Sequence, residues 1–290
     1  MFWAKSRTLG LLISEITNPF FPELIQIFED IAGESGFEMM VGSTNYNRER
    51  APMFIRRLVQ RRVEGVAVMT FRDEGHLLDP LIQQKIPLVL VGVNTGPRLS
   101  QVLEIDYDKG IKQAVQHLAV LGHRRIAFAS GPLPHLTNIR RKEAFEKAAR
   151  EIGLSAEAAP VLIGEHTFEG GTKAAEHFLA LKKPPTGIVC SNDLMAVGVL
   201  RILTERNIPV PQAMSVVGFD DIHLAEFANP PLSTVRMSRN DLARAAFRAL
   251  EQLRHGTVER SAKPFRIETM LVVRKSTDHP ANLLPDVRDR

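Results

Sequence analysis

The stretch Ser215-Val216-Val217-Gly218-Phe219-Asp220-Asp221 decides the fold. Its run of apolar β-formers lacks polar alternation, which is typical of a strand buried on both faces of a parallel sheet. The run ends at two carboxylates. Ligands of open parallel α/β sheets bind outside the carboxyl ends of the strands, so Asp220 is the first candidate for a ligand contact. We interpret its neighbour Asp221 as a structural partner or cap.

The rest of the chain repeats a strand–helix unit. An apolar strand over Thr8–Ser14 is followed by an amphipathic helix from about Pro22 to Ser35. The same alternation continues to Phe219 and implies parallel sheets with right-handed crossovers. About nine strands are expected before residue 220, which is too many for one small sheet. The sequence therefore predicts an α/β protein of two similar lobes, each a parallel sheet flanked by helices, with the second lobe starting near Tyr107.

Composition describes a globular chain of 290 residues, of which 44% are hydrophobic and 24% charged. The net charge of +4 is mild and is not gathered into the basic stripe that marks a nucleic-acid surface. The single cysteine, Cys190, excludes an intrachain disulfide and lies in an apolar run typical of the core. The sequence shows neither a signal peptide nor a membrane span, so we expect a cytoplasmic protein with no membrane partner.

Motifs of the common enzyme classes are missing from the sequence. No G-x-G-x-x-G follows a strand, and no P-loop, G-x-S-x-G elbow or H-E-x-x-H is present. His117 and His123 have the wrong spacing for a metal pair on one helix face, so we expect structural roles for both. Asp220-Asp221 with His223 is an alternative acid/base or metal cluster, less favoured because adjacent residues of an extended chain point to opposite sides. We therefore expect no catalytic residue, no metal and no cofactor.

The loops that follow the predicted strands carry carboxylate, guanidinium, amide and aromatic groups. These are the groups that hold a small polar ligand. Structural alternatives stay open, because Phe20 can staple the first helix, Asn192 can cap a helix, and Arg141 can be a solvated charge. The loop segments concerned are Asn18–Phe21, Thr70, His135–Arg141, His166–Phe168, Ser191–Asp193 and Asp220.

A series of short motifs resembles the effector-binding core of the LacI/GalR family of bacterial transcription regulators. The motifs are Thr8–Leu12, Asn18–Phe21, Arg62–Val66, Leu121–Ala127, Ser191–Ala196, Ser215–Asp221, Pro230–Val235 and Leu271–Arg274. Their order and spacing are specific, and the resemblance covers about Thr8 to Thr277. It implies a periplasmic-binding-protein-like fold with crossover strands. The implied N-terminal lobe is 8–106 completed by about 238–265, the C-terminal lobe is 107–237 completed by about 266–280, and 281–290 is a tail.

The resemblance also implies where an effector binds. It places the effector between the two lobes, and it matches His135, Thr137 and His166 to positions that vary with the effector in the family. The predicted effector-binding residues are Phe20, Thr70, His135, Thr137, Arg141, His166, Asn192 and Asp220.

The implied function is that of a repressor core that senses a sugar or a related polar metabolite. Members of the family work as homodimers and bind operator DNA through an N-terminal helix-turn-helix. Only about seven residues precede Thr8, so we expect that this chain alone reads no operator and that it is a trimmed or stand-alone core. The alternative function is a secreted solute-binding receptor of a transporter.

Overall fold

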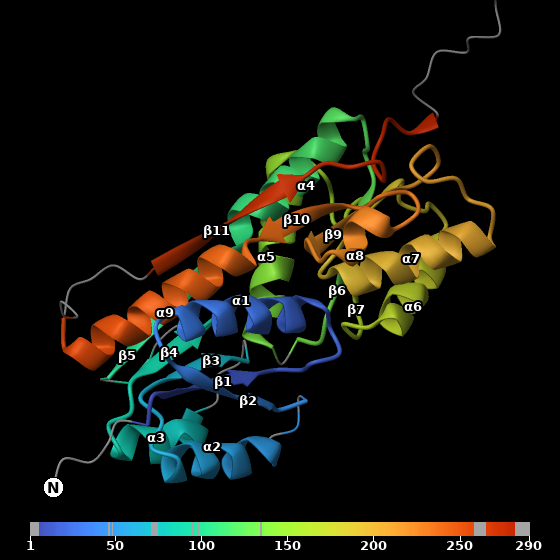
Figure 1. Cartoon of the computed structure of the whole chain (residues 1–290). Helices are drawn as coiled ribbons and strands as arrows, with labels where there is room; N and C mark the ends of the chain where they lie inside the picture. Colours follow the sequence, from blue (N-terminus) through green and yellow to red (C-terminus); the bar gives the residue numbers. More distant parts are fainter. Residues whose placement is uncertain are drawn as a thin grey trace, which may run out of the picture. The chain divides into compact units, whose positions relative to one another are not determined.

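The computed structural model describes residues 6–45, 47, 49–70, 75–93, 96–97, 99–133, 135–257 and 265–281 (Figure 1). The chain forms two compact units. Unit 1 comprises Met1–Ile105 and Ser238–Ile267, and unit 2 comprises Asp106–Met237 and Glu268–Arg290. The chain thus passes between the units three times, as in a fold with crossover strands. Most of the predicted tail, residues 282–290, lies outside the described residues.

Unit 1 contains a parallel sheet in the order β2-β1-β3-β4-β5. Figure 1 shows α1 and α9 on one face of this sheet and α2 and α3 on the other. The strands are β1 (Thr8–Ile13), β2 (Glu38–Ser43), β3 (Val66–Met69), β4 (Leu88–Val91) and β5 (Ser100–Asp106). The helices are α1 (Phe20–Glu34), α2 (Arg50–Gln60), the 3-10 turn η1 (Gly75–Leu78), α3 (Asp79–Gln83) and α9 (Arg239–His255).

Unit 2 contains a sheet in the order β11-β10-β9-β8-β6-β7. Helices α4 and α5 pack together, as do α6 and α7. The strands are β6 (Ile126–Ser130), β7 (Val161–Ile163), β8 (Gly187–Cys190), β9 (Ser215–Asp220), β10 (Ser233–Met237) and β11 (Phe265–Val272). The helices are α4 (Tyr107–Val120), α5 (Leu136–Glu151), α6 (Phe168–Leu179), α7 (Asp193–Glu205) and α8 (Leu224–Phe227).

The stretch Ser215–Asp220 forms strand β9. All six of its residues are buried, and both neighbouring strands, β8 and β10, run parallel to it. The prediction of a strand covered on both faces is confirmed. The predicted α/β fold with parallel sheets is confirmed, and β11 is the one described strand that runs antiparallel to its neighbour β10. The chain leaves unit 2 after β10 and returns through β11, so this strand re-enters the sheet in the opposite direction.

The cores of both units are aliphatic and aromatic, as the pattern predicts. In unit 2, Cys190 lies within a cluster that includes Phe178, Ile188 and Val216, and burial raises the pKa of its thiol. This confirms its predicted place in the core. Among the described helices, none is long and apolar enough to cross a membrane.

Glycine lets α6 and α7 approach each other closely in unit 2. A Cβ atom on Gly171 would lie 2.0 Å from the backbone oxygen of Met195, a distance that no side chain tolerates. The backbone of α7 therefore lies directly against α6 at this position. Large side chains on both helices are buried around the contact.

We predict that Gly171→Ala destabilises unit 2 by about 1–3 kcal/mol, because the added methyl group forces the two helices apart. Thermal unfolding followed by circular dichroism measures the effect. Gly164→Ala in the same unit is the control, since its Cβ would meet no atom closer than 3.8 Å. Equal melting temperatures for the two variants would contradict the close helix contact.

Candidate functional site

The carboxyl-end edge of the unit 2 sheet brings several predicted ligand-binding residues together. Arg141 lies on α5, which follows β6, while Asn192 precedes α7 and Asp220 ends β9. The buried face of α5 repeats at helical spacing through Thr137, Arg141, Ala144 and Ala148. Sequence periodicity therefore places the guanidinium of Arg141 on the side of the helix that packs inward rather than in solvent.

Asp220 and Asp221 occupy an unusual backbone conformation. Their φ angles are 108° and 55°, in the left-handed region that non-glycine residues adopt at a cost. Such strain persists only where surrounding contacts determine the conformation, and it gathers at functional sites. Both carboxylates are buried. The strained backbone of Asp220 must therefore be stabilised by contacts with other residues of unit 2.

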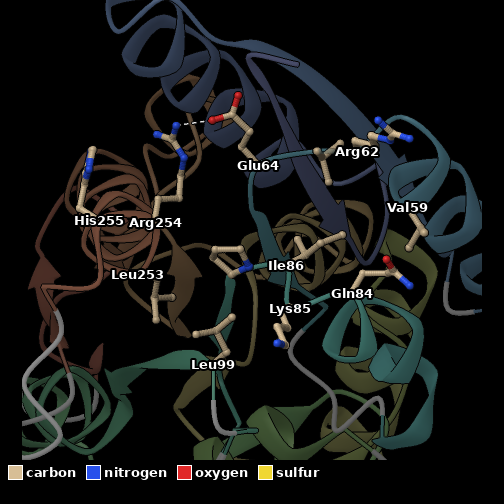
Figure 2. Close-up of a pocket in the computed structure, with 12 residues that line it drawn as sticks. Val59, Arg62, Glu64, Gln84, Lys85, Ile86, Leu99, Leu253, Arg254 and His255 are labelled. Atoms are coloured by element: carbon tan, nitrogen blue, oxygen red, sulfur yellow. Dashed lines mark hydrogen bonds and ion pairs between the residues drawn. The ribbon is translucent and has the colours of Figure 1, made fainter. Parts of the chain in front are cut away.

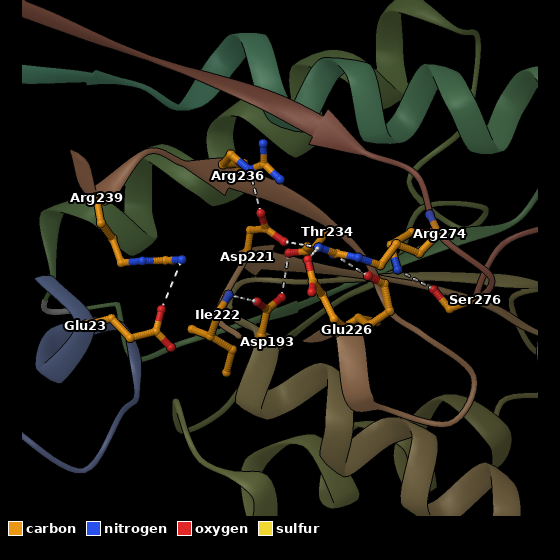
Figure 3. A network of polar contacts seen from close by, with 12 residues as sticks. Glu23, Asp193, Asp221, Ile222, Glu226, Thr234, Arg236, Arg239, Arg274 and Ser276 are labelled. Carbon is orange, nitrogen blue, oxygen red and sulfur yellow. Dashed lines mark hydrogen bonds and ion pairs between the residues drawn. The ribbon is translucent and has the colours of Figure 1, made fainter. Parts of the chain in front are cut away.

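Asp193 holds this turn, a role that the sequence analysis missed (Figure 3). Its Oδ2 accepts a hydrogen bond from the backbone N–H of Ile222 at 2.9 Å, and its Oδ1 accepts one from the Thr234 hydroxyl at 2.6 Å. A Cβ on Gly218 would lie 2.0 Å from Oδ1, so glycine is required beneath the carboxyl. Burial, followed by the charge of Asp220, raises the pKa of Asp193 well above its ordinary value, which favours its neutral form.

Asp221 is a structural partner, as predicted. Its carboxylate forms ion pairs with Arg236 at 2.5 Å and with Arg274 at 2.8 Å, both drawn in Figure 3. Arg274 also pairs with Glu226 at 3.0 Å. These contacts tie the turn after β9 to β10 and to the segment that follows β11. Asp221 therefore anchors the strained turn while its neighbour Asp220 faces Arg141.

The guanidinium of Arg141 packs against two neighbouring aromatic rings. Its guanidinium carbon lies 4.1 Å from the ring centre of Phe219 and 5.0 Å from that of Tyr107. One terminal nitrogen donates to the backbone oxygen of Ser191, and the other lies 3.6 Å from Oδ1 of Asp220. The alternative of a solvated charge is wrong, because the side chain is buried.

Nε of Arg141 and the hydroxyl oxygen of Tyr107 are buried at this position and make no well-aligned hydrogen bond among the described residues. The Arg141 side chain nevertheless acts on the Tyr107 hydroxyl through its charge and a weak hydrogen bond. Burial raises the pKa of Tyr107, so its hydroxyl stays protonated and able to donate. Buried groups of this kind are normally satisfied, so each calls for a partner such as a ligand or a water molecule.

His166 adds a neutral imidazole to the site. Its ring packs on Gly131, where a Cβ would lie 2.1 Å from Nε2, and the same nitrogen lies 2.9 Å from the Ser191 hydroxyl. Burial, then the charges of Arg141 and His135, lower the pKa of His166 to about 3. The ring is therefore uncharged near neutral pH and offers one donor and one acceptor.

Asn192 serves as a helix cap. Its Oδ1 accepts from the backbone N–H of Met195 at 2.9 Å, and its Nδ2 donates to the backbone oxygen of His166 at 3.2 Å. The structural alternative left open by the sequence is thus realised. One amide hydrogen and one lone pair stay available for a ligand.

The other predicted residues are placed as follows. His135 occupies the N-cap position of α5 without a side-chain cap hydrogen bond, and Thr137 lies buried in the first turn of that helix. Phe20 and Thr70 belong to unit 1, where both are buried, Phe20 at the start of α1 and Thr70 after β3. Their role in ligand binding stays a prediction.

The two histidines set aside as structural have structural contacts. His123 is fully buried, with Nδ1 2.8 Å from the Thr186 hydroxyl and Nε2 3.0 Å from the Ser215 hydroxyl. His117 lies 3.0 Å from the Thr277 hydroxyl. Within the described part of the chain, no group of three or more His, Cys, Asp or Glu side chains is placed to hold a metal ion.

Comparisons with known proteins agree with this architecture. A periplasmic binding protein-like domain matches residues 115–277. The chain is 31% identical to the HTH-type transcriptional repressor PurR of Photobacterium profundum, over 93% of this chain and 81% of that protein. It is 36% identical to an HTH-type transcriptional regulator in the aml 5′ region of Streptomyces limosus, over 93% and 78%. A LacI family transcriptional regulator from Enterococcus faecium, solved with bound ribose, superposes with a TM-score of 0.83 at 25% identity, covering 94% of this chain and 99% of that one.

We predict that His166 makes the stability of unit 2 fall as the solution is acidified. The unfolded chain protonates this imidazole below about pH 6.5, whereas the folded site resists protonation down to about pH 3, so folding is disfavoured progressively between these values. His166→Gln removes the effect, and its urea-unfolding free energy drops less between pH 7 and pH 5 than that of the parent protein. Substituting the exposed His177 by Gln is the control. Identical pH slopes for His166→Gln and the parent protein would exclude an imidazole that stays neutral in the folded site.

Proposed function

Because this chain belongs to the LacI/GalR family of transcriptional regulators, we propose that the strand-end site of unit 2 binds a small polyhydroxylated effector, a sugar or a related polar metabolite. The observation that carries the proposal is the buried Arg141, stacked on Phe219 and Tyr107 with an unpartnered Nε, facing the carboxylate of Asp220. The chemistry of these groups suits hydroxyl groups on a compact ring.

The proposed role of each side chain follows from the hydrogen bonds that it can make to the effector. The Asp220 carboxylate accepts from two neighbouring hydroxyls, and the Arg141 guanidinium donates to ring or hydroxyl oxygens. The neutral His166 and the remaining amide capacity of Asn192 supply further polar contacts. Charged side chains that are already held in place lose little conformational freedom on binding, which favours affinity.

The relatives support a sugar as the ligand class and a regulator as the protein class. The Enterococcus faecium regulator was solved with ribose, and related proteins are named HTH-type regulators or repressors. This favours the sensing core of a DNA-binding regulator over a secreted solute receptor. Neither role requires turnover of the ligand, and we propose that the effector is released chemically unchanged.

The proposed regulation links effector binding to DNA binding. We infer that the chain acts as a homodimer. We also infer that a helix-turn-helix segment reads operator DNA, as the name of the relative PurR suggests. If the effector changes operator affinity by some factor, operator DNA must change effector affinity by the same factor. Phe20 and Thr70 are proposed as the contribution of unit 1 to effector recognition.

We predict that Asp220→Asn and Arg141→Lys weaken effector binding about ten- to hundredfold, as expected when about 1.5–3 kcal/mol of charge-assisted hydrogen bonding is lost. Asparagine tolerates the positive φ of position 220, so the backbone turn is preserved. A panel of ribose, cellobiose and lactose is screened by thermal shift, and the sugar that raises the melting temperature most is titrated by calorimetry.

The matched control is Asp108→Asn, which neutralises an exposed carboxylate of the same unit. It is expected to bind the sugar like the parent protein. Parent-like affinity in both site variants would show that the site is placed wrongly. Conversion of the bound sugar during long incubation would contradict a purely sensing role.

A further inference from the structure

Unit 1 carries a pocket, shown in Figure 2. It is at the opposite end of the strands from Thr70, which follows β3. It lies where β3, β4 and β5 begin, since Glu64, Pro87 and Leu99 immediately precede these strands or come within two residues of them. Its volume is about 490 Å³, within the range of small-molecule sites. The pocket is lined by Val59, Arg62, Val63, Glu64, Gln84, Lys85, Ile86, Pro87, Leu99, Leu253, Arg254 and His255.

The walls of the pocket combine apolar side chains with cations. Val63, Ile86 and Leu253 are buried hydrophobic residues, and Leu99 is partly exposed beside them. In Figure 2 the ion pair between Glu64 and Arg254 lies on one side of the pocket, and Val59 and Gln84 lie on the other. The surface is therefore suited to a ligand with both an apolar body and a polar group.

The two helices α2 and α3 end at this pocket in the same way. Each closes with a residue in the left-handed conformation, Arg62 at φ 52° and Lys85 at φ 54°. The N–H of Arg62 bonds to the oxygen of Val59 and that of Lys85 to the oxygen of Ile82, while the next N–H in each case reaches back to the preceding turn. These are the helix-ending loops in which glycine or asparagine is normally favoured.

Elsewhere in the described chain, that preference is followed. Five other helices end at a residue with positive φ, and in each of them that residue is glycine or asparagine. The residues are Gly36 after α1, Gly122 after α4, Gly153 after α5, Asn207 after α7 and Gly256 after α9. Only α2 and α3, among the described helices, have a long cation at this position. The two helix ends that carry a cation at positive φ are thus the two that line the pocket.

Glu64 forms no ion pair with Lys85 among the described residues. Its Oε1 accepts from the backbone N–H of Arg7 at 2.9 Å, and its Oε2 pairs with Arg254, which also pairs with Glu251. His255 lies 3.6 Å from Glu251. The ammonium group of Lys85, in contrast, has no ion-pair partner among the residues that the structure describes.

We propose that this pocket binds a small organic anion, whose apolar body contacts Ile86, Leu99 and Leu253 and whose carboxylate or phosphate pairs with Lys85. The strained cation at the end of α3 is the group that recognises the charge. The proposal does not depend on the effector site of unit 2, because the two sets of residues share no member.

Benzoate, with benzamide as its neutral counterpart, tests the proposal on the whole chain by amide-resolved NMR titration. Benzoate binds with a dissociation constant on the order of 1 mM, a value expected of a ligand with few atoms, and shifts the signals of Lys85 and His255. Benzamide binds at least about fivefold more weakly, and added salt weakens benzoate because the ion pair is exposed.

Three variants locate the charge. Lys85→Asn weakens benzoate about fivefold while its melting temperature equals or exceeds that of the parent, since asparagine is at ease at positive φ. Lys85→Arg retains binding. Arg56→Gln, an exposed cation on α2 outside the pocket, also retains binding. Equal binding of benzoate and benzamide, unchanged benzoate affinity in Lys85→Asn, or shifts confined to unit 2 would each overturn the proposal.

Discussion

The gathering of three carboxyl groups at the end of β9 is the constraint on which unit 2 depends. Asp193, Asp220 and Asp221 are all buried, and like charges at such positions repel strongly in a medium of low dielectric constant. Two features of unit 2 reduce this repulsion. Arg141, Arg236 and Arg274 bring positive charge to the cluster, and burial pushes Asp193 toward its neutral form.

This arrangement explains how a strained turn becomes a rigid binding surface. Asp221 forms ion pairs with Arg236 and Arg274, and Asp193 hydrogen-bonds to the backbone of the turn. Asp220 is the carboxylate of the three that faces Arg141. Arg141 is in turn fixed by two aromatic rings and by the oxygen of Ser191. A buried ion pair is weak evidence for stability, but it fixes the positions of its partners. Groups fixed in this way need little reorganisation when a ligand arrives.

Local patterns in the sequence were enough to predict β9, the alternation of strands and helices, and the presence of Asp220 at a strand end. What they could not predict depends on contacts between distant residues. Asp193 acts through Ile222 and Thr234, which lie 29 and 41 positions away. Tyr107 marked only a lobe boundary in the sequence, yet its ring supports Arg141. The direction of β11 also follows from the path of the chain between units and has no signature in its own residues.

Backbone strain offers a signal that residue type alone does not. In unit 2, two aspartates with positive φ form the turn that carries the proposed effector contact. In unit 1, two cations with positive φ line a pocket where the strands of that unit's sheet begin. Glycine or asparagine would remove most of the conformational cost of a positive φ at the turn or at the pocket. The chain uses these residues at the other helix ends that have a positive φ. At such a position the side chain contributes a charge or a contact that glycine lacks, as Asp221 does through its ion pairs with Arg236 and Arg274. That reasoning identifies charge as the property retained at Asp220, where it faces Arg141, and at Lys85, where it faces an open pocket.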